Sequence, residues 1–197
     1  LADDDASAAN GFGAVMGSKK LKAIAVGGKK RLTAANPEKL QSLTEHIRRM
    51  VGDEPRTWHV ERDIVPHGYP PNLEEALRQR IKKQVCYGCS GNTCTRSTYQ
   101  ATDGTRGKRT CVGPGFYREP ARRFYGEWNE DIPFHANRLL DDYGLNIFTV
   151  ELLIKWIKEC NREGILTDEN TGIPISKIGS LEFIETIAKK IALRDGF

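Results

Sequence analysis

Three cysteines lie within nine residues of this 197-residue chain, and they constrain its fold more than any other feature. Cys86, Cys89 and Cys94 follow a C-x2-C-x4-C spacing, so three thiolates can face one point in space. Such a point in a protein usually holds a metal ion or an iron–sulfur cluster. A site with four ligands needs one more donor, and Cys111 is a candidate within the chain.

The spacing favours an iron–sulfur cluster over zinc. A zinc ribbon needs two C-x2-C pairs, and only Cys86 and Cys89 form one. A zinc knuckle needs a histidine at the position of Cys94. A four-cysteine zinc site completed by Cys111, and a set of unliganded thiols, both stay open at this point. Cys160 falls on the apolar face of a predicted helix, which indicates a buried structural thiol.

The composition is that of a soluble globular protein, with 39% hydrophobic and 28% charged residues. No apolar run reaches the roughly 20 residues that span a bilayer. The odd count of five cysteines argues against a disulfide framework and for a reducing, cytoplasmic compartment. Because the chain begins at Leu1 rather than methionine, we expect it to be a fragment of a longer protein.

The cysteines lie inside a basic block, residues 76–123, which contains eleven lysines and arginines against Asp103 and Glu119. Nearby cations would stabilise an anionic cluster and raise its potential. A solvated basic face is an equally simple interpretation. A nucleic-acid-binding face is a third.

Residues 1–30 differ from the rest of the chain. They contain small residues, a glycine-rich loop at 10–19 and a short apolar run at 21–26 that predicts a strand. The glycine order matches neither a Walker A loop nor a dinucleotide fingerprint, so an anion site at this loop is only weakly indicated.

The remainder of the chain predicts helices. Asn36 and Pro37 begin one helix, and Asn72, with Glu75 at the capping-box position, begins a second that continues to about residue 84. Residues 86–129 read as mostly irregular, and helices follow at about 132–143, from 149 to Gly164 and from Ser180 to about 196. We therefore predict a mainly α fold with a short β-containing N-terminal segment and a long cluster-binding loop.

Two further features bear on function. Residues 141–146 form the end of a predicted helix, where Gly144 is an ordinary stop signal. The four histidines show no metal-ligand spacing, although His135 lies less than two helical turns before Asp141.

Taken in order, these pieces resemble the aldehyde:ferredoxin oxidoreductase family of tungsten enzymes. Residues 11–26 are similar to the segment that ends the family's first domain. The cysteine trio resembles the family's cluster ligands, which are usually spaced C-x2-C-x3-C. Residues 136–146 resemble a segment that carries the family's D-x-x-G-L-D/C pterin-binding motif.

The resemblance implies two domains and three cofactors. Residues 1–30 would end a β-rich, pterin-binding first domain, and residues 31–197 would be a truncated helical second domain. The cofactors would be a [4Fe–4S] cluster, a tungsten or molybdenum bis-pterin, and Mg²⁺ bridging the pterin phosphates. The cluster ligands would be Cys86, Cys89 and Cys94, with the fourth in a domain outside this chain. The pterin contacts would be Ser7, Ala8, Ala9, Asn10 and Gly11 near the phosphates, and Asp141, Leu145 and Asn146.

The implied reaction passes electrons between the bis-pterin metal centre and ferredoxin, or another electron-transfer subunit, through the cluster.

The chain departs from the family's sequence at two places. The family's arginine before the Gly-Ala-Val-Met stretch is absent, and Gly115 replaces the glutamate of a Gly-Pro-Glu-Tyr context. Residues 107–117 resemble instead the branch with the benzoyl-CoA reductase catalytic subunit, so the resemblance implies that the substrate would be an aldehyde or an aromatic acyl-CoA. No catalytic residue is assigned.

The expected partners follow from the same resemblance. They are the electron carrier, the remaining domains of a longer protein and a second copy of the chain, whereas nucleic acid and a membrane are not expected. Two other functions stay open from the residues alone, namely a four-cysteine zinc module that binds nucleic acid and a small iron–sulfur electron carrier.

Overall fold

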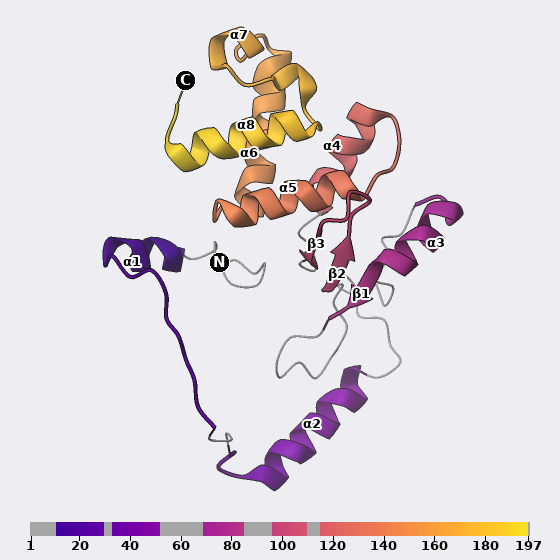
Figure 1. Cartoon of the computed structure of the whole chain (residues 1–197), viewed down its shortest axis with the longest axis vertical. Helices are drawn as coiled ribbons and strands as arrows, with labels where there is room; N and C mark the ends of the chain where they lie inside the picture. Colours follow the sequence, from indigo (N-terminus) through magenta and orange to yellow (C-terminus); the bar gives the residue numbers. More distant parts are fainter. Residues whose placement is uncertain (1–10, 30–32, 52–68, 85–95, 110–114, 197) are drawn as a thin grey trace.

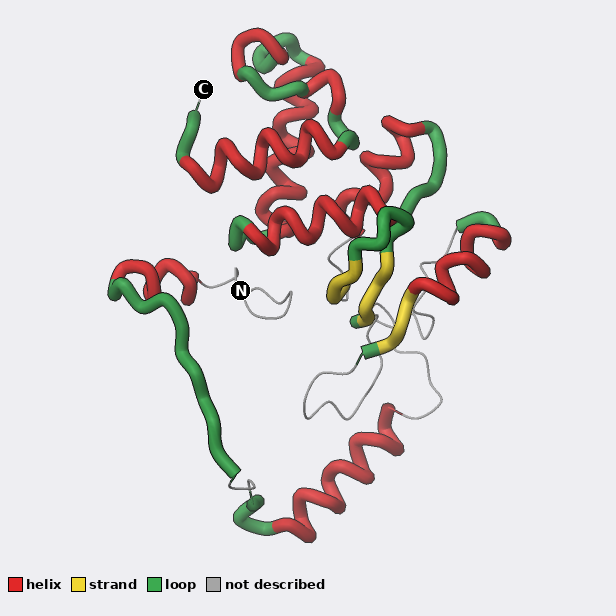
Figure 2. The backbone as a smooth tube through the Cα atoms, in the orientation of Figure 1, coloured by secondary structure: helices red, strands yellow, loops and turns green. Residues whose placement is uncertain are grey.

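The computed structural model describes residues 11–29, 33–51, 69–84, 96–109 and 115–196 (Figure 1). Helices dominate these residues, which confirms the predicted mainly α class (Figure 2). The elements are α1 (Phe12–Ser18), α2 (Pro37–Val51), α3 (Pro71–Arg80), β1 (Ile81–Lys83), β2 (Ser97–Gln100), β3 (Arg106–Arg109), α4 (Gly115–Tyr125), α5 (Asp131–Asp142), α6 (Ile147–Arg162), α7 (Asp168–Thr171), the 3-10 helix η2 (Ile175–Lys177) and α8 (Leu181–Leu193).

The main core lies among the C-terminal helices. α5 packs against both α4 and α8, and α4 also contacts α6 (Figure 1). The apolar face of α8 shows why: Phe183, Ile184 and Ile187 recur at helical spacing, and each is at most 2% exposed. Full burial of one such side chain contributes about 1.5–3 kcal/mol, so this face holds α8 on the core.

A small antiparallel sheet, with strand order β1-β2-β3, lies beside α5. Its register pairs Ile81 with Tyr99 and Tyr99 with Gly107. A second apolar cluster covers the inner face, and Phe134 from α5 meets Tyr99 edge to face with 4.9 Å between the ring centroids. The sheet is therefore anchored to the helical core through α5.

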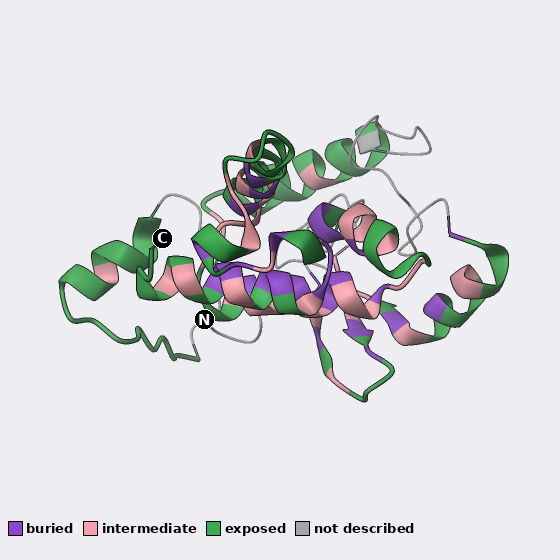
Figure 3. Cartoon of the chain, turned by 90° about the horizontal axis from the view of Figure 1, so that it is seen from above, coloured by how far each residue is buried: buried purple, intermediate pink, exposed green. Residues whose placement is uncertain are grey.

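The N-terminal helices α1 and α2 present their apolar side chains to solvent (Figure 3). The predicted start of α2 is confirmed, because the Asn36 side chain accepts a hydrogen bond from the backbone N–H of Lys39 at 2.9 Å. Leu40, Leu43 and Ile47 line one side of α2, and all three are more than 40% exposed.

Two predictions within the N-terminal residues are wrong. The described part of the predicted glycine-rich loop contains α1, which begins after Gly11. The predicted strand at 21–26 is not a strand, because none of the described strands pairs with it. Strand propensity does not create a strand without a partner for its hydrogen bonds.

The helix predicted before the cysteines is present as α3, but its predicted N-cap and its predicted end are wrong. α3 begins at Pro71 rather than after Asn72, and its N-cap, Pro70, makes no side-chain capping bond. That helix stops at Arg80, and β1 takes the place of its expected last residues. The stretch 86–129, expected to be mostly irregular, contains β2, β3 and α4.

The three C-terminal helices are confirmed. α6 begins two residues earlier than expected, because Asn146 is its N-cap and accepts a hydrogen bond from the backbone N–H of Thr149 at 3.1 Å. Ser180 caps α8 in the same way, through the N–H of Phe183. Among the described residues, no helix combines the length and apolar character that crossing a membrane requires.

Candidate cofactor-binding site

The described strands β1 and β2 flank the segment that contains the cysteine trio. Cys86, Cys89 and Cys94 lie in residues 85–95, outside the described residues. The chain on either side of this segment is paired, since Lys83 stands opposite Ser97 and the N–H of Gln84 donates to the carbonyl of Arg96 at 2.9 Å. The two described residues that flank the cysteine segment, Gln84 and Arg96, are therefore joined by a backbone hydrogen bond.

Cys111 follows the same end of the sheet in sequence. It also lies outside the described residues, in 110–114, two positions after Arg109, the last residue of β3. Arg109 pairs with Ser97, which pairs with Lys83, so described residues on either side of 85–95 and before 110–114 lie in one row across the sheet. The ligand roles of these cysteines, and the identity of a fourth ligand, stay predictions.

A buried carboxylate ties this end of the sheet to the helices. Glu130, directly before α5, has a side chain with no exposed surface. It accepts hydrogen bonds from Arg118 on α4, at 3.0 Å for each carboxylate oxygen, and forms an ion pair with Arg109 at 2.9 Å. The Tyr69 hydroxyl donates to the same carboxylate. Glu130 therefore joins β3, α4 and the chain before α3.

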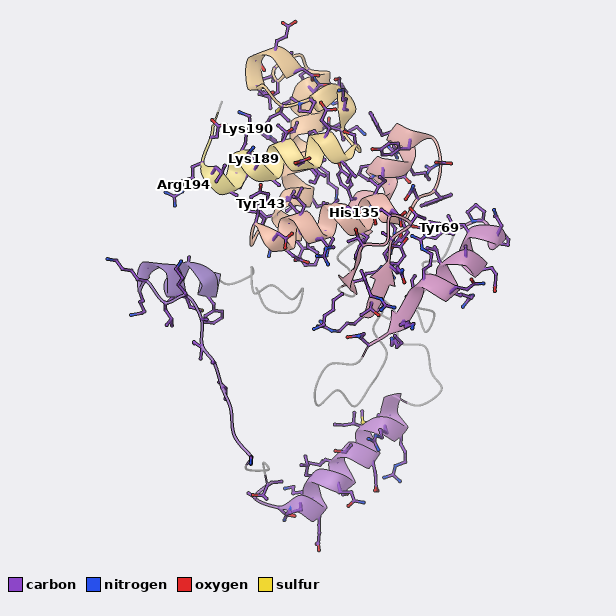
Figure 4. All side chains as sticks on the ribbon, viewed as in Figure 1. Tyr69, His135, Tyr143, Lys189, Lys190 and Arg194 are labelled. Atoms are coloured by element: carbon purple, nitrogen blue, oxygen red, sulfur yellow. The ribbon has the colours of Figure 1, made fainter. Side chains whose placement is uncertain are left out.

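The electrostatics of Glu130 follow from these partners. Burial alone raises the pKa of a carboxyl group, but Arg109, Arg118 and the hydrogen bonds outweigh it, so the pKa of Glu130 lies below its ordinary value. Burial, with the Glu130 charge, raises the pKa of Tyr69 well above its usual range. Glu130 is thus a carboxylate and Tyr69 a neutral donor at neutral pH. Figure 4 labels Tyr69 beside α3.

Asp131 forms a second anchor next to the first. It accepts hydrogen bonds from the Tyr99 hydroxyl at 2.5 Å and from the backbone N–H of Thr102 at 3.1 Å. It also forms an ion pair with Arg80, at the end of α3. Burial opposes ionisation of Asp131, yet these donors lower the pKa of its carboxyl group. Glu130 and Asp131 together fix the sheet, α3 and α4 onto the start of α5.

Part of the basic block is therefore neutralised by carboxylates of the chain itself. Five of its arginines form ion pairs with carboxylates of the chain, and these are Arg80, Arg109, Arg118, Arg122 and Arg123. Arg122 and Arg123 hold the pKa of the exposed Glu119 down to about 2. These pairings argue against a continuous basic face for nucleic acid.

The predicted pterin-contact residues form a well-defined helix end. The N–H of Gly144, with φ +67°, bonds to the Asp141 carbonyl, and the N–H of Leu145 to the Leu140 carbonyl at 2.8 Å. These two bonds make a Schellman motif. The Asp141 carboxylate accepts a hydrogen bond from the Asn137 side chain at 2.9 Å, and Asn146 caps α6. Each residue thus has a structural role, whether or not it meets a cofactor.

The other predicted residues lie as follows. Ser7, Ala8, Ala9 and Asn10 are outside the described residues, and Gly11 is exposed at the start of α1 with φ +70°. His135, which Figure 4 labels on α5, contacts the Asp103 carboxylate, with 3.2 Å between Nε2 and Oδ2. Cys160 is free and only half-buried, less buried than expected. The described residues contain no group of three histidine, cysteine or acidic side chains that could hold a metal ion.

The sequence of this region matches a known family. A family model described as "Aldehyde ferredoxin oxidoreductase, domains 2 & 3" matches residues 66–197, which is more than half of the chain. The chain belongs to the aldehyde ferredoxin oxidoreductase family. The match includes the three cysteines, both carboxylate anchors and the 141–146 helix end, but not residues 7–11.

Individual proteins that carry the family's name are also similar to the chain. The chain is 27% identical over 213 residues to the tungsten-containing aldehyde ferredoxin oxidoreductase of Thermococcus kodakarensis, which covers 93% of the chain and 34% of the relative. It is 25% identical to the enzymes of the same name from Pyrococcus abyssi and Pyrococcus furiosus, covering 98% of the chain and 35% of each relative. The chain thus spans about a third of the length of these relatives. No solved structure gives a significant match.

Proposed function

We propose that this chain is the cluster-binding part of a tungsten pterin oxidoreductase, with Cys86, Cys89 and Cys94 as ligands of a [4Fe–4S] cluster. The observation that carries the proposal is the family match over residues 66–197, which includes a three-cysteine loop closed by the pairing of β1 with β2. Thiolates are the ligands that iron–sulfur clusters require, so the donor set fits the group.

The chain's own residues would hold this loop in place. When bound, an iron–sulfur cluster accepts and releases single electrons. The paired strands fix the two ends of residues 85–95, and Glu130 fixes the last residue of β3 through Arg109. Ends held in this way would limit how far the cysteine ligands could move relative to one another, which would help to hold the cluster.

The remaining cofactor assignments belong to the same proposal. Residues 1–30 would end the pterin-binding first domain, and 31–197 would form the helical domain. Asp141, Leu145 and Asn146 would contact a tungsten or molybdenum bis-pterin, and residues 7–11 its phosphates, with Mg²⁺ between them. The Asn137–Asp141 hydrogen bond would orient the carboxylate for a pterin N–H donor.

Substrate and partners also follow from the family relationship. We propose that an aldehyde is oxidised and that ferredoxin receives the electrons, in a cytoplasmic enzyme built from this chain, its remaining domains and a second copy. An aromatic acyl-CoA is the second substrate class, because residues 107–117 resemble the benzoyl-CoA reductase branch. The full-length protein, assayed anaerobically with an aldehyde and with an aromatic acyl-CoA, separates the two substrates.

The cluster itself is tested by anaerobic reconstitution of the chain with iron and sulfide. The proposal predicts a brown protein whose broad visible absorption is bleached by dithionite. Cys86→Ser and Cys89→Ser should lose most of this absorption, whereas Cys160→Ser, a change at a half-buried cysteine far from the hairpin in sequence, should retain it. A colourless chain that binds one zinc ion would contradict the proposal and favour the zinc module.

A further inference from the structure

A cleft of about 600 Å³ lies between α4, α6 and the 3-10 helix η2. Both α4 and η2 pack against α6, so described elements form its walls. Its volume falls within the range of about 300–1,000 Å³ that is typical of small-molecule sites. Along α6 the cleft extends over residues 151–161, from about 8 Å to about 22 Å beyond Asn146 at a rise of 1.5 Å per residue. It is therefore separate from the predicted pterin contacts at 141–146.

The floor of the cleft is apolar. The buried side chains that line it are Phe116 on α4, Ile154 on α6 and Ile175 on η2, and each is at most 8% exposed. Phe124 also lines the cleft, and this large apolar side chain is 40% exposed. A ligand with an apolar body would remove these surfaces from water, which is favourable in proportion to the area covered.

The rim of the cleft has one cation that the chain does not neutralise. Glu119 pairs with Arg123 at 2.8 Å, and Glu151 pairs with Lys155 at 2.7 Å, so both carboxylates of the rim already have partners. Lys158 is the remaining charged side chain of the lining, and it takes part in no ion pair or hydrogen bond among the described residues. The rim therefore offers an ammonium group, and no free carboxylate, to a ligand.

We propose that this cleft binds a small amphipathic carboxylate, with its apolar body on the floor and its carboxylate at the Lys158 ammonium. A lysine ammonium is a single charge on a flexible stem, so it can follow a carboxylate at the rim. A phosphate dianion would bring a second negative charge for which the lining has no free cation. The site is independent of the proposed function, because no lining residue is a predicted cofactor contact.

The test is a set of NMR titrations of the chain, followed through its backbone amide signals. The probe is hexanoate, and 1-hexanol and hexylammonium are the uncharged and cationic analogues of the same length. Hexanoate should cause saturable shifts in α4, α6 and η2, with a dissociation constant on the order of 1 mM. Hexanol should bind about fivefold more weakly, because it lacks one exposed ion pair, and hexylammonium should bind more weakly still.

Two matched pairs of variants separate the charge from the apolar floor. Lys158→Ala should weaken hexanoate about fivefold and leave hexanol unchanged. Lys189→Ala is its control, because Lys189 is an exposed lysine of α8 that does not line the cleft (Figure 4). Phe124→Ala should weaken both ligands, whereas Phe148→Ala, at an exposed phenylalanine outside the lining, should weaken neither. The amide spectrum of each variant shows whether it folds.

The outcomes decide between a carboxylate site and an apolar surface. Tighter binding of hexanoate than of hexanol, lost in Lys158→Ala and kept in Lys189→Ala, supports the inference. Equal binding of hexanoate and hexanol would overturn the carboxylate and leave an apolar docking surface. Shifts spread over the whole chain, or no saturable shift in α4, α6 and η2, would overturn the site. The iron and sulfide content of the reconstituted chain tests the proposed function separately.

Discussion

Replacement of Glu130 by glutamine tests the buried anchor of the sheet. The carboxylate faces Arg109, whose side chain is 3% exposed, and Arg118, whose side chain is 22% exposed. Glu130→Gln conserves shape but leaves Arg109 as a buried charge without its counter-ion. Breaking a buried pair in this way costs about 3–5 kcal/mol. The amide oxygen of the glutamine still accepts one hydrogen bond, and Arg118 is partly hydrated. We therefore expect the free energy of unfolding to fall by about 3 kcal/mol, the lower end of this range.

The assay is urea unfolding followed by far-ultraviolet circular dichroism and tryptophan fluorescence. Trp128 reports on the anchor directly, because its ring lies 4.8 Å from that of Tyr69. Glu119→Gln is the control, since its ion pairs with Arg122 and Arg123 are exposed and its loss should leave the transition unchanged. If the free energy of unfolding fell by less than about 1 kcal/mol in Glu130→Gln, the argument that Arg109 depends on the buried Glu130 carboxylate would be refuted.

Three further predictions follow from single residues. The pKa values of Glu130 and Asp131 are lowered in the folded chain, so the unfolded chain binds more protons in acid. The free energy of unfolding should therefore fall below about pH 4.5, by up to about 1.4 kcal/mol per pH unit for each group. Urea titrations at each pH should show a less steep fall in Glu130→Gln. Gly179→Ala should prevent folding, as judged by circular dichroism, because φ is +110° and an added Cβ would lie 2.2 Å from the Pro120 carbonyl oxygen; a native-like spectrum would contradict this. Gly144→Ala should lower the free energy of unfolding by only about 1–2 kcal/mol in thermal unfolding, because φ is +67° but an added Cβ meets nothing within 4 Å. Gly144→Asn should lower it by less, since asparagine tolerates the left-handed conformation. Equal losses in both variants would show that left-handed strain is not the cause.

Local signals predicted the helices of the C-terminal half. Asn146 and Ser180 cap α6 and α8, and Gly144 ends the turn after α5, so capping and apolar spacing both indicated these elements. The strands were missed because they are short and polar. β3 reads Arg-Gly-Lys-Arg, which has no strand propensity, and it exists because β2 pairs with it.

The carboxylate anchors were not predictable from the sequence. Glu130 meets Tyr69 across 61 residues and Arg118 across 12, and no spacing rule connects them. An acidic pair at a helix start reads locally as a favourable charge near the helix N-terminus. The basic block did not reveal them either, because arginines on a solvated face need no partner and the sequence does not say which of them are buried. The 141–146 turn was found because its backbone bonds are local.

Metal analysis of the anaerobically reconstituted chain tests the central claim most directly. Iron, inorganic sulfide and zinc are measured in one sample, beside Cys89→Ser prepared in the same way. The claim predicts equal amounts of iron and sulfide, approaching about four of each per chain, with a large loss in Cys89→Ser and little zinc. Stoichiometric zinc without sulfide, or iron that Cys89→Ser retains in full, would contradict it.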